Sequence, residues 1–162
     1  MKRKTAVLAI WLIAVSGSLI TGCASEPNAA ISSASMSQFT VQYSNPALEQ
    51  DLNPEGLKVA FVEYWQAYGA RDWKRRYSLE KFARPLEEKF YVAYHAKAWT
   101  ARSILVTAAS VTEQAASIDV ALTMTDPEKM SDVIQSHRDK WEFADGVWRH
   151  VVQDPMLAGF AQ

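Results

Sequence analysis

The stretch Trp141-Glu142-Phe143-Ala144-Asp145-Gly146-Val147-Trp148-Arg149 decides the fold, because it has the pattern of a β-hairpin. Asp145-Gly146 suits a two-residue type I′ turn, in which both central residues need positive φ. The turn fixes the pairs across the two strands, which are Ala144 with Val147, Phe143 with Trp148, Glu142 with Arg149, Trp141 with His150 and Asp139 with Val152. The hairpin therefore predicts the last two strands of an antiparallel sheet, at about 133–143 and 147–153.

The same register divides the side chains of the hairpin between two faces, because side chains alternate along a strand. The face expected to point toward the core carries Trp141, Phe143, Trp148, His150, Asp139 and Val152. Glu142 and Arg149 lie opposite each other on the other face. We expect them to form a surface ion pair, worth under about 1 kcal/mol.

Upstream of the hairpin, residues 104–108 and 118–124 alternate between apolar and polar and predict two more strands. The residues before them have helical spacing. Three helices are expected at about 54–69, 72–79 and 85–99, with start signals at Pro54, Asp72 and Pro85. The expected apolar side of the third helix is Leu86, Phe90, Ala93 and Tyr94. The predicted fold class is α+β, with N-terminal helices packed on a curved antiparallel sheet of about four strands.

This order of elements resembles the nuclear transport factor 2-like (NTF2-like) superfamily over residues 51–155. The resemblance rests on an aromatic helix ending in Gly69-Ala70-Arg71-Asp72-Trp73 and on the closing hairpin. It implies a sheet bent around the helices into a cone, whose open end is often a ligand cavity. Members include dehydratases and isomerases with His or Asp in the cone, as well as non-catalytic domains, so the fold does not settle the function.

The N-terminus has the pattern of an export signal, with Lys2-Arg3-Lys4 followed by an apolar segment at 5–20. Ile20-Thr21-Gly22-Cys23 resembles the lipobox of bacterial lipoproteins. The resemblance implies a signal peptide at 1–22 and a lipid on Cys23 that attaches the protein to a bilayer, whereas the alternative is an uncleaved membrane helix. Ala24 replaces the aspartate that retains many lipoproteins at the inner membrane, which implies an outer membrane location facing the periplasm.

Residues 23–50 are expected to form a flexible tether, because they are rich in Ser, Ala, Asn and Gln and carry little charge. Phe39, Val41 and Tyr43 interrupt this composition with an alternation of period two. They fit a short edge strand, a segment that docks on a partner, or local stickiness. The folded domain is expected at 51–155, and the apolar tail at 156–162 either docks on the sheet or meets a partner.

The composition excludes several kinds of site. With 162 residues, 49% of them hydrophobic and 22% charged, the chain is expected to form a single globular domain. The single cysteine excludes an intramolecular disulfide and any multi-cysteine metal site. Phosphate-binding, nucleophile-elbow and dinucleotide motifs are absent, and no cofactor is expected. The basic run Lys74-Arg75-Arg76 does not indicate nucleic acid in an exported domain with more acidic than basic residues.

The candidate catalytic residues are His137, Asp139 and His150. His137 and Asp139 share one face of a strand, and His150 lies diagonally across from Asp139 at about 7–8 Å between backbones. A carboxylate beside an imidazole in an apolar cavity suits acid/base chemistry, and two histidines with a carboxylate suit a metal. The alternative is that His137 and Asp139 lie at a solvated strand end and His150 packs beside Trp141. No metal is assigned.

Aromatic residues are the other notable feature, and most of them are expected to fill the core. They are Phe61, Tyr64, Trp65, Tyr68, Tyr91, Tyr94, Trp99, Trp141 and Trp148. Three of them, Tyr64, Tyr94 and Trp141, are the candidate ligand-binding residues.

The predicted function is a membrane-anchored, non-enzymatic lipoprotein that serves as an accessory or binding domain for an envelope protein partner. One alternative is a carrier or sensor of a small apolar ligand in the cone. A second alternative is a cavity enzyme of the isomerase or dehydratase type. A sealed, aromatic-filled cone argues against both alternatives, whereas an open pocket holding His137 or Asp139 favours them.

Overall fold

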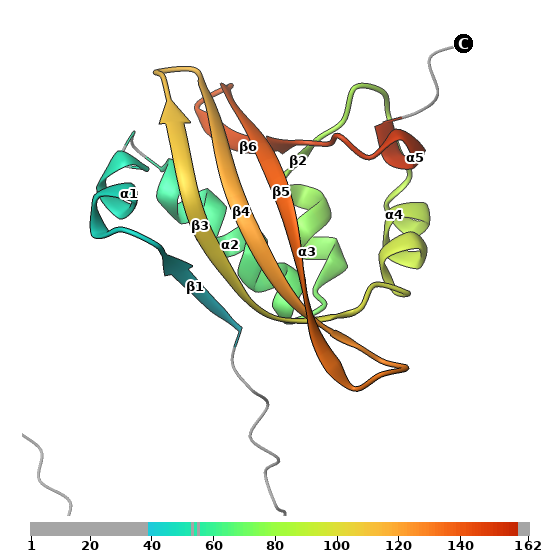
Figure 1. Ribbon diagram of the computed structural model, residues 1–162. Coiled ribbons are helices and arrows are strands. Elements are labelled where there is room, and N and C mark those ends of the chain that lie inside the picture. Colours follow the sequence, from blue (N-terminus) through green and yellow to red (C-terminus); the bar gives the residue numbers. More distant parts are fainter. Residues whose placement is uncertain (1–38, 53, 55, 159–162) are drawn as a thin grey trace, which may run out of the picture. The chain divides into compact units, whose positions relative to one another are not determined.

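The computed structural model describes residues 39–52, 54 and 56–158 (Figure 1). The elements, in chain order, are β1 (Thr40–Tyr43), α1 (Pro46–Asp51), α2 (Leu57–Gly69), α3 (Trp73–Ser78), β2 (Glu80–Lys81), α4 (Glu88–His95), β3 (Thr100–Val111), β4 (Ala115–Asp126), β5 (Ser131–Ala144), β6 (Val147–Val151) and α5 (Pro155–Ala158). None of the helices among these residues is long and apolar enough to span a membrane. The predicted signal peptide and Cys23 lie outside the described residues.

The fold class is α+β, as predicted, but the sheet has six strands instead of about four. Its strand order is β1-β3-β4-β5-β6-β2. Strands β3 to β6 are antiparallel, whereas β1 pairs in parallel with β3 and β2 pairs in parallel with β6. The two additional strands lie at the edges and are only four and two residues long. Such short segments carry too few residues for a period-two pattern to stand out.

The hairpin turn forms as predicted, with Asp145 at φ 54° and Gly146 at φ 79°. The four pairs nearest the turn have the predicted register. The fifth, Asp139 with Val152, is not part of the ladder, because β6 ends at Val151 and Val152 donates its backbone N–H to Lys81 of β2.

Two predictions about the hairpin faces are wrong. Phe143 was assigned to the core but is 39% exposed, because it lies near the end of the hairpin. Glu142 pairs with Lys81, because β2 extends the sheet on the far side of β6 and brings that lysine close. Arg149, the expected partner of Glu142, donates to the backbone carbonyl of Ser78.

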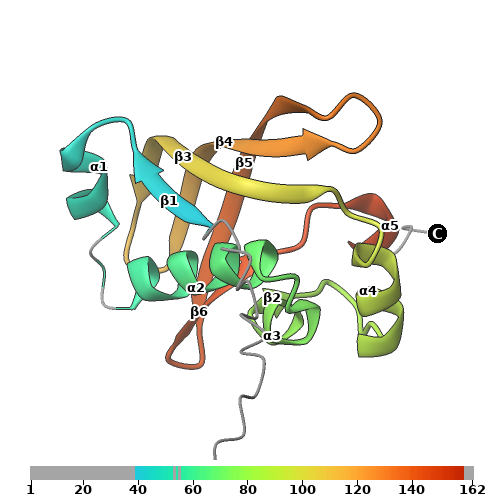
Figure 2. The same ribbon diagram turned by 90° about the horizontal axis from the view of Figure 1, so that it is seen from below.

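Helices α2 and α3 lie behind the sheet, with α2 across its concave face, whereas α1 lies beside the edge strand β1 (Figures 1 and 2). Helix α2 was expected to start at Pro54 but begins at Leu57, with Gly56 at its N-cap in the left-handed region. The buried side of α2 consists of Leu57, Phe61, Tyr64, Trp65, Ala67 and Tyr68. In α3 the side chain of Asp72 accepts from the backbone N–H of Arg75, which confirms the predicted cap.

Helix α4 presents a different side to the core from the one predicted. Tyr91 is fully buried, whereas Phe90 and Tyr94 are 46% and 36% exposed. Tyr91 packs edge to face against Tyr77 and Phe82, with ring centroids 5.4 and 5.8 Å away. Because the helix has only eight residues, a single buried aromatic ring sets its orientation.

The predicted tether and the predicted C-terminal tail each contain an ordered element. β1 lies within segment 23–50, and α1 crosses its C-terminal end. Val41 and Tyr43 belong to the edge strand β1, and Phe39 directly precedes it. Val41 pairs with Ile104 of β3. In the C-terminal tail, α5 buries Leu157 against the core.

Candidate functional site

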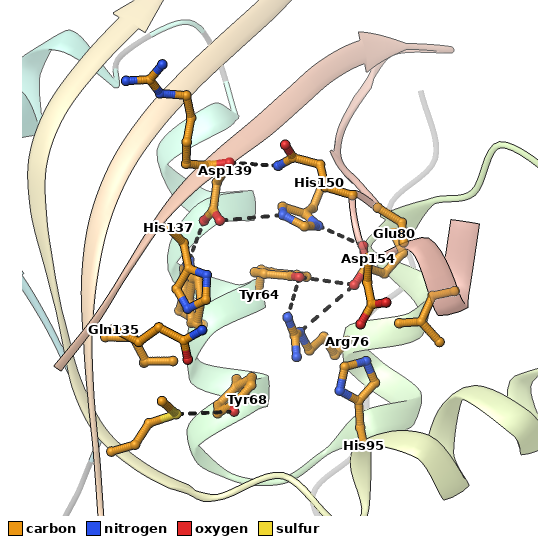
Figure 3. A pocket seen from close by; sticks show the side chains of 17 residues that line it. Tyr64, Tyr68, Arg76, Glu80, His95, Gln135, His137, Asp139, His150 and Asp154 are labelled. Carbon is orange, nitrogen blue, oxygen red and sulfur yellow. Dashed lines mark hydrogen bonds and ion pairs between the residues drawn. The ribbon is translucent and has the colours of Figure 1, made fainter. Parts of the chain in front are cut away.

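A cavity of about 420 Å³ lies between the helices and strands β4 to β6. Its lining includes Tyr64, Trp65 and Tyr68 from α2, Arg76 from α3, Glu80 from β2, His137 and Asp139 from β5, and His150 from β6 (Figure 3). Three further lining residues, Gln135, Arg138 and Gln153, are exposed to solvent. The cavity therefore opens at the surface and holds both His137 and Asp139.

Glu80 is the centre of the buried hydrogen-bond network in this cavity. Its Oε1 accepts from the hydroxyls of Tyr64 at 3.0 Å and Tyr91 at 2.8 Å, and its Oε2 lies 2.7 Å from Nδ1 of His150. Burial favours the neutral acid, but His150 and Arg76 outweigh it and hold the pKa of Glu80 below its ordinary value. The carboxylate is therefore charged inside the protein.

His150 lies between two carboxylates. Its Nε2 is 3.6 Å from Oδ1 of Asp139, and its ring stacks on Tyr64 with centroids 4.3 Å apart. Burial alone would lower the pKa of His150, but Asp139 and Glu80 together raise this pKa to about 9. A histidine that is protonated at neutral pH has no free lone pair, so His150 is unsuited to act as a base. Its position suits a structural cation.

Asp139 and His137 differ in their surroundings, although both line the cavity. Asp139 is 4% exposed and accepts from Nε1 of Trp65 at 2.9 Å. His137 is half-buried, and burial lowers its pKa despite the opposing charge of Asp139. The structure thus brings the predicted trio of His137, Asp139 and His150 to one cavity. Among the residues that the structure describes, no group of three His, Cys, Asp or Glu side chains has an arrangement that could hold a metal ion.

Arg76 carries the unpaired donors of the site. Its side chain is 8% exposed, and its guanidinium carbon lies 4.4 and 4.6 Å from the ring centroids of Tyr64 and Tyr68. Nη2 donates to the hydroxyl of Tyr64, while Nε is 4.0 Å from Oε1 of Glu80, beyond hydrogen-bond distance. Nε and Nη1 have no hydrogen-bond partner in the described part of the chain. Buried donors without partners are costly, so Arg76 is the least well paired charged group of this lining.

His95 of α4 is a second incompletely paired group in the lining. Its ring stacks on Trp73 with centroids 5.4 Å apart. Burial and the charge of Arg76 lower the pKa of His95 to about 4, so the ring is neutral at physiological pH. Its Nε2 is buried and has no partner among the described residues.

The predicted ligand-binding residues fall in three different places. Tyr64 lines the cavity, with its hydroxyl inside the network. Trp141 lies in the core and is 1% exposed. Tyr94 lies at the surface, where its hydroxyl donates to Asp154 at 2.6 Å. Neither residue lines the cavity. Sequence reasoning missed Arg76 and Glu80. The one signal available was their i, i+4 spacing at the end of a helix rich in aromatic residues.

The comparisons with known proteins reach only distant structures. No protein-family profile matches the chain, and no curated protein matches it. A SEC-C motif containing protein from Psychrobacter arcticus is 10% identical with a TM-score of 0.51, and the match covers 67% of this chain and 64% of that one. A SEC-C motif containing protein from Rhodopseudomonas palustris is 14% identical, with a TM-score of 0.48 and coverages of 66% and 84%. A protein of unknown function from Mycobacterium tuberculosis is 17% identical, with a TM-score of 0.45 and coverages of 65% and 72%.

These findings correct the expected family. Of these three, the structure that matches with a TM-score above 0.5 is a SEC-C motif containing protein, so the predicted membership of the NTF2-like superfamily is wrong. Nothing in the comparisons supports a lipobox signal peptide either, and that assignment is withdrawn. At such low identity the likeness concerns the fold alone. The function has to be argued from the cavity itself.

Proposed function

We propose that this chain is a small-molecule-binding protein whose ligand occupies the cavity and accepts a hydrogen bond from Arg76. The observation that carries the proposal is a buried arginine that lines an open cavity of about 420 Å³ and has two N–H groups without a partner among the described residues. Cavities of this size, with apolar walls and a few placed polar groups, are typical small-molecule sites. Leu122, Met124 and Leu157 supply apolar wall here.

The paired state of the carboxylates favours binding over catalysis. Glu80 and Asp139 already accept hydrogen bonds from tyrosine and tryptophan donors, and His150 is held as a cation between them. A general base needs a free lone pair within reach of the substrate, which protonated His150 lacks, and the two oxygens of Glu80 are already engaged by Tyr64, Tyr91 and His150. The network instead fixes the position of Arg76. An envelope protein partner stays a prediction from the sequence, whereas the cavity gives the ligand-binding alternative a specific site.

The test is binding of an uncharged naphthyl ketone such as prodan, whose emission shifts to the blue in an apolar site. Its carbonyl offers Arg76 an acceptor, and its ring system suits the apolar wall. We expect saturable binding to the wild-type protein and at least about tenfold weaker binding to Arg76→Gln, because a charged hydrogen bond is worth ~1.5–3 kcal/mol. Arg102→Gln is the matched control, since Arg102 is exposed, pairs with Asp132 and does not line the cavity.

A second variant keeps the test decisive if Arg76→Gln does not fold. Gln135 is exposed at the mouth of the cavity and takes no part in the buried network. Gln135→Trp should therefore leave the fold intact, as measured by circular dichroism, and obstruct entry of the probe. Unchanged prodan binding in folded Gln135→Trp, or no saturable binding to the wild type, would overturn the proposal.

A further inference from the structure

A second hollow of about 400 Å³ adjoins the cavity on the side of strand β5. Trp99, Val133 and Ile134 line it together with Lys97 and Ala98, and no acidic side chain is among its lining residues. Trp99 and Ile134 are 40% and 69% exposed, which is unusual for large apolar side chains. The hollow is therefore an apolar surface next to the cavity, and the carboxylates Glu80 and Asp139 line the cavity and not the hollow.

The hollow and the cavity share one wall, formed by Tyr68, Met124 and Gln135. Inside this wall the hydroxyl of Tyr68 points to Sδ of Met124 at 3.9 Å, which is a weak contact. Methionine is flexible, and Gln135 is exposed at the rim. A linear molecule that occupies both spaces would have to pass these three shared side chains.

The charges of the cavity indicate which polar group the ligand carries. The cavity lining balances its charges. Three of its side chains are cationic, namely Arg76, Arg138 and protonated His150, and three are carboxylates, namely Glu80, Asp139 and Asp154. Glu80 already places a carboxylate oxygen 4.0 Å from Nε of Arg76, so an anionic group bound at Arg76 would add an unbalanced negative charge to this buried setting, at a cost. An uncharged acceptor satisfies the arginine without that cost.

We infer that the ligand is an uncharged amphipathic molecule, with a carbonyl-type oxygen on Arg76 and an unbranched apolar chain in the hollow lined by Trp99 and Ile134. The inference rests on the proposed function, because it assigns the ligand class of the same cavity. The cavity holds the buried charged groups and the adjoining hollow has no acidic lining residue, so a ligand of both spaces carries its polar group at one end and its apolar chain at the other.

The test is displacement of prodan by straight-chain primary amides of increasing length. We expect affinity to rise about fourfold per methylene over the range in which the chain enters the hollow, and then to level off. The carboxylate of equal length should bind at least tenfold more weakly than the amide. Ile134→Ser should reduce the gain per methylene, and Val59→Ser is the matched control, because Val59 is also 69% exposed but lines neither space.

The outcomes separate this inference from the proposed function. If prodan binds but the affinity of the amides does not depend on their chain length, the proposal that an apolar chain occupies the hollow is overturned. The cavity would remain a binding site. Carboxylates that bind more tightly than amides, and lose this advantage in Lys97→Gln, would instead indicate an anion at Lys97 and overturn the uncharged headgroup. Failure of prodan itself to bind would refute the proposed function.

Discussion

Glu80 is the residue on which the buried network depends, because hydrogen bonds from Tyr64, Tyr91 and His150 converge on its two oxygens. Glu80→Gln keeps the shape of the side chain but removes its charge, and leaves protonated His150 with one carboxylate. We expect the free energy of unfolding to fall by about 3 kcal/mol, the usual result of removing one partner of a buried ion pair. Urea unfolding of the wild type and the variant measures this difference in the free energy of unfolding. Glu113→Gln, at the exposed turn between β3 and β4, is the control, and an equal effect in both variants would contradict the role of Glu80.

His150 should make the stability of the protein depend on pH in one particular direction. The pKa of His150 is about 9 in the folded protein against an ordinary value of 6.5. A histidine whose pKa is higher in the folded than in the unfolded protein stabilises the folded state. This stabilisation is complete below pH 6.5 and is lost as the pH rises through 9. The pKa values of His95 and His137 are lowered, so their contributions change on the acid side instead.

We therefore expect the free energy of unfolding to drop by about 3 kcal/mol between pH 6.5 and 9.5. Urea titrations at closely spaced pH values measure the slope, and His150→Gln should largely remove it. If the wild type and His150→Gln had the same slope over this range, the ion pairs of His150 would not be formed in solution.

For single residues, the sequence supports predictions only where a rule that depends on neighbouring residues applies, as it does for a turn. The type I′ turn set the register and thereby brought Asp139 close to His150, as the structure confirms. Arg76 and Glu80 escaped prediction, because a charged residue at the end of a short helix is normally solvated. Their burial depends on β2 adding to the edge of β6, which is a tertiary event.

The edge strand β1 depends on one close approach between elements. Gly69, at the end of α2, lies against the side chain of Phe39, which directly precedes β1, and a Cβ at position 69 would overlap that side chain. We expect Gly69→Ala to displace Phe39 and to lower the free energy of unfolding by about 1–3 kcal/mol, as overpacking does. Thermal unfolding followed by circular dichroism measures the loss.

A double mutant distinguishes this clash from a general effect on the helix. Phe39→Gly removes the group that the new methyl would meet, so Gly69→Ala should cost much less in that background. Strictly additive losses would show that the contact between Phe39 and Gly69 does not position β1.

Elements differ in how far local sequence determines them. Strands β4 and β5 have 12 and 14 residues, long enough for alternation to be recognised, and Asp72 supplies an unambiguous cap for α3. β1 and β2 follow from strand partners distant in sequence, and the orientation of α4 follows from the packing of Tyr91 on Tyr77 and Phe82. A few residues with mixed polarity fit several structures equally well until those partners are present.

For the whole molecule, composition and the change of apolar period predicted the α+β class correctly. The family resemblance was wrong because it used the order of helices and strands and one closing hairpin, and many folds of this class share both. Neither feature carries information on the parallel edge strands. The two strands that were missed complete the sheet at both edges, and one of them supplies Glu80 to the cavity.

Ligand binding in the cavity should be coupled to the stability of the whole fold. The cavity is built from α2, α3, β2, α4, β4, β5, β6 and the C-terminal segment, so a ligand that binds there contacts most of the fold and requires it to be formed. A ligand at a hundred times its dissociation constant then stabilises the folded state by about 2.7 kcal/mol. For a domain of this size the melting temperature should rise by roughly 5 °C or more.

Prodan or the best primary amide should produce this rise in the wild-type protein, measured by circular dichroism over a range of ligand concentrations. Arg76→Gln should show a smaller rise, and Gln135→Trp little or none. The size of the rise has to follow the dissociation constant measured by fluorescence, because both report the same binding equilibrium. A rise in melting temperature of equal size in Gln135→Trp would show that the ligand binds elsewhere on the molecule and that the cavity is not the binding site.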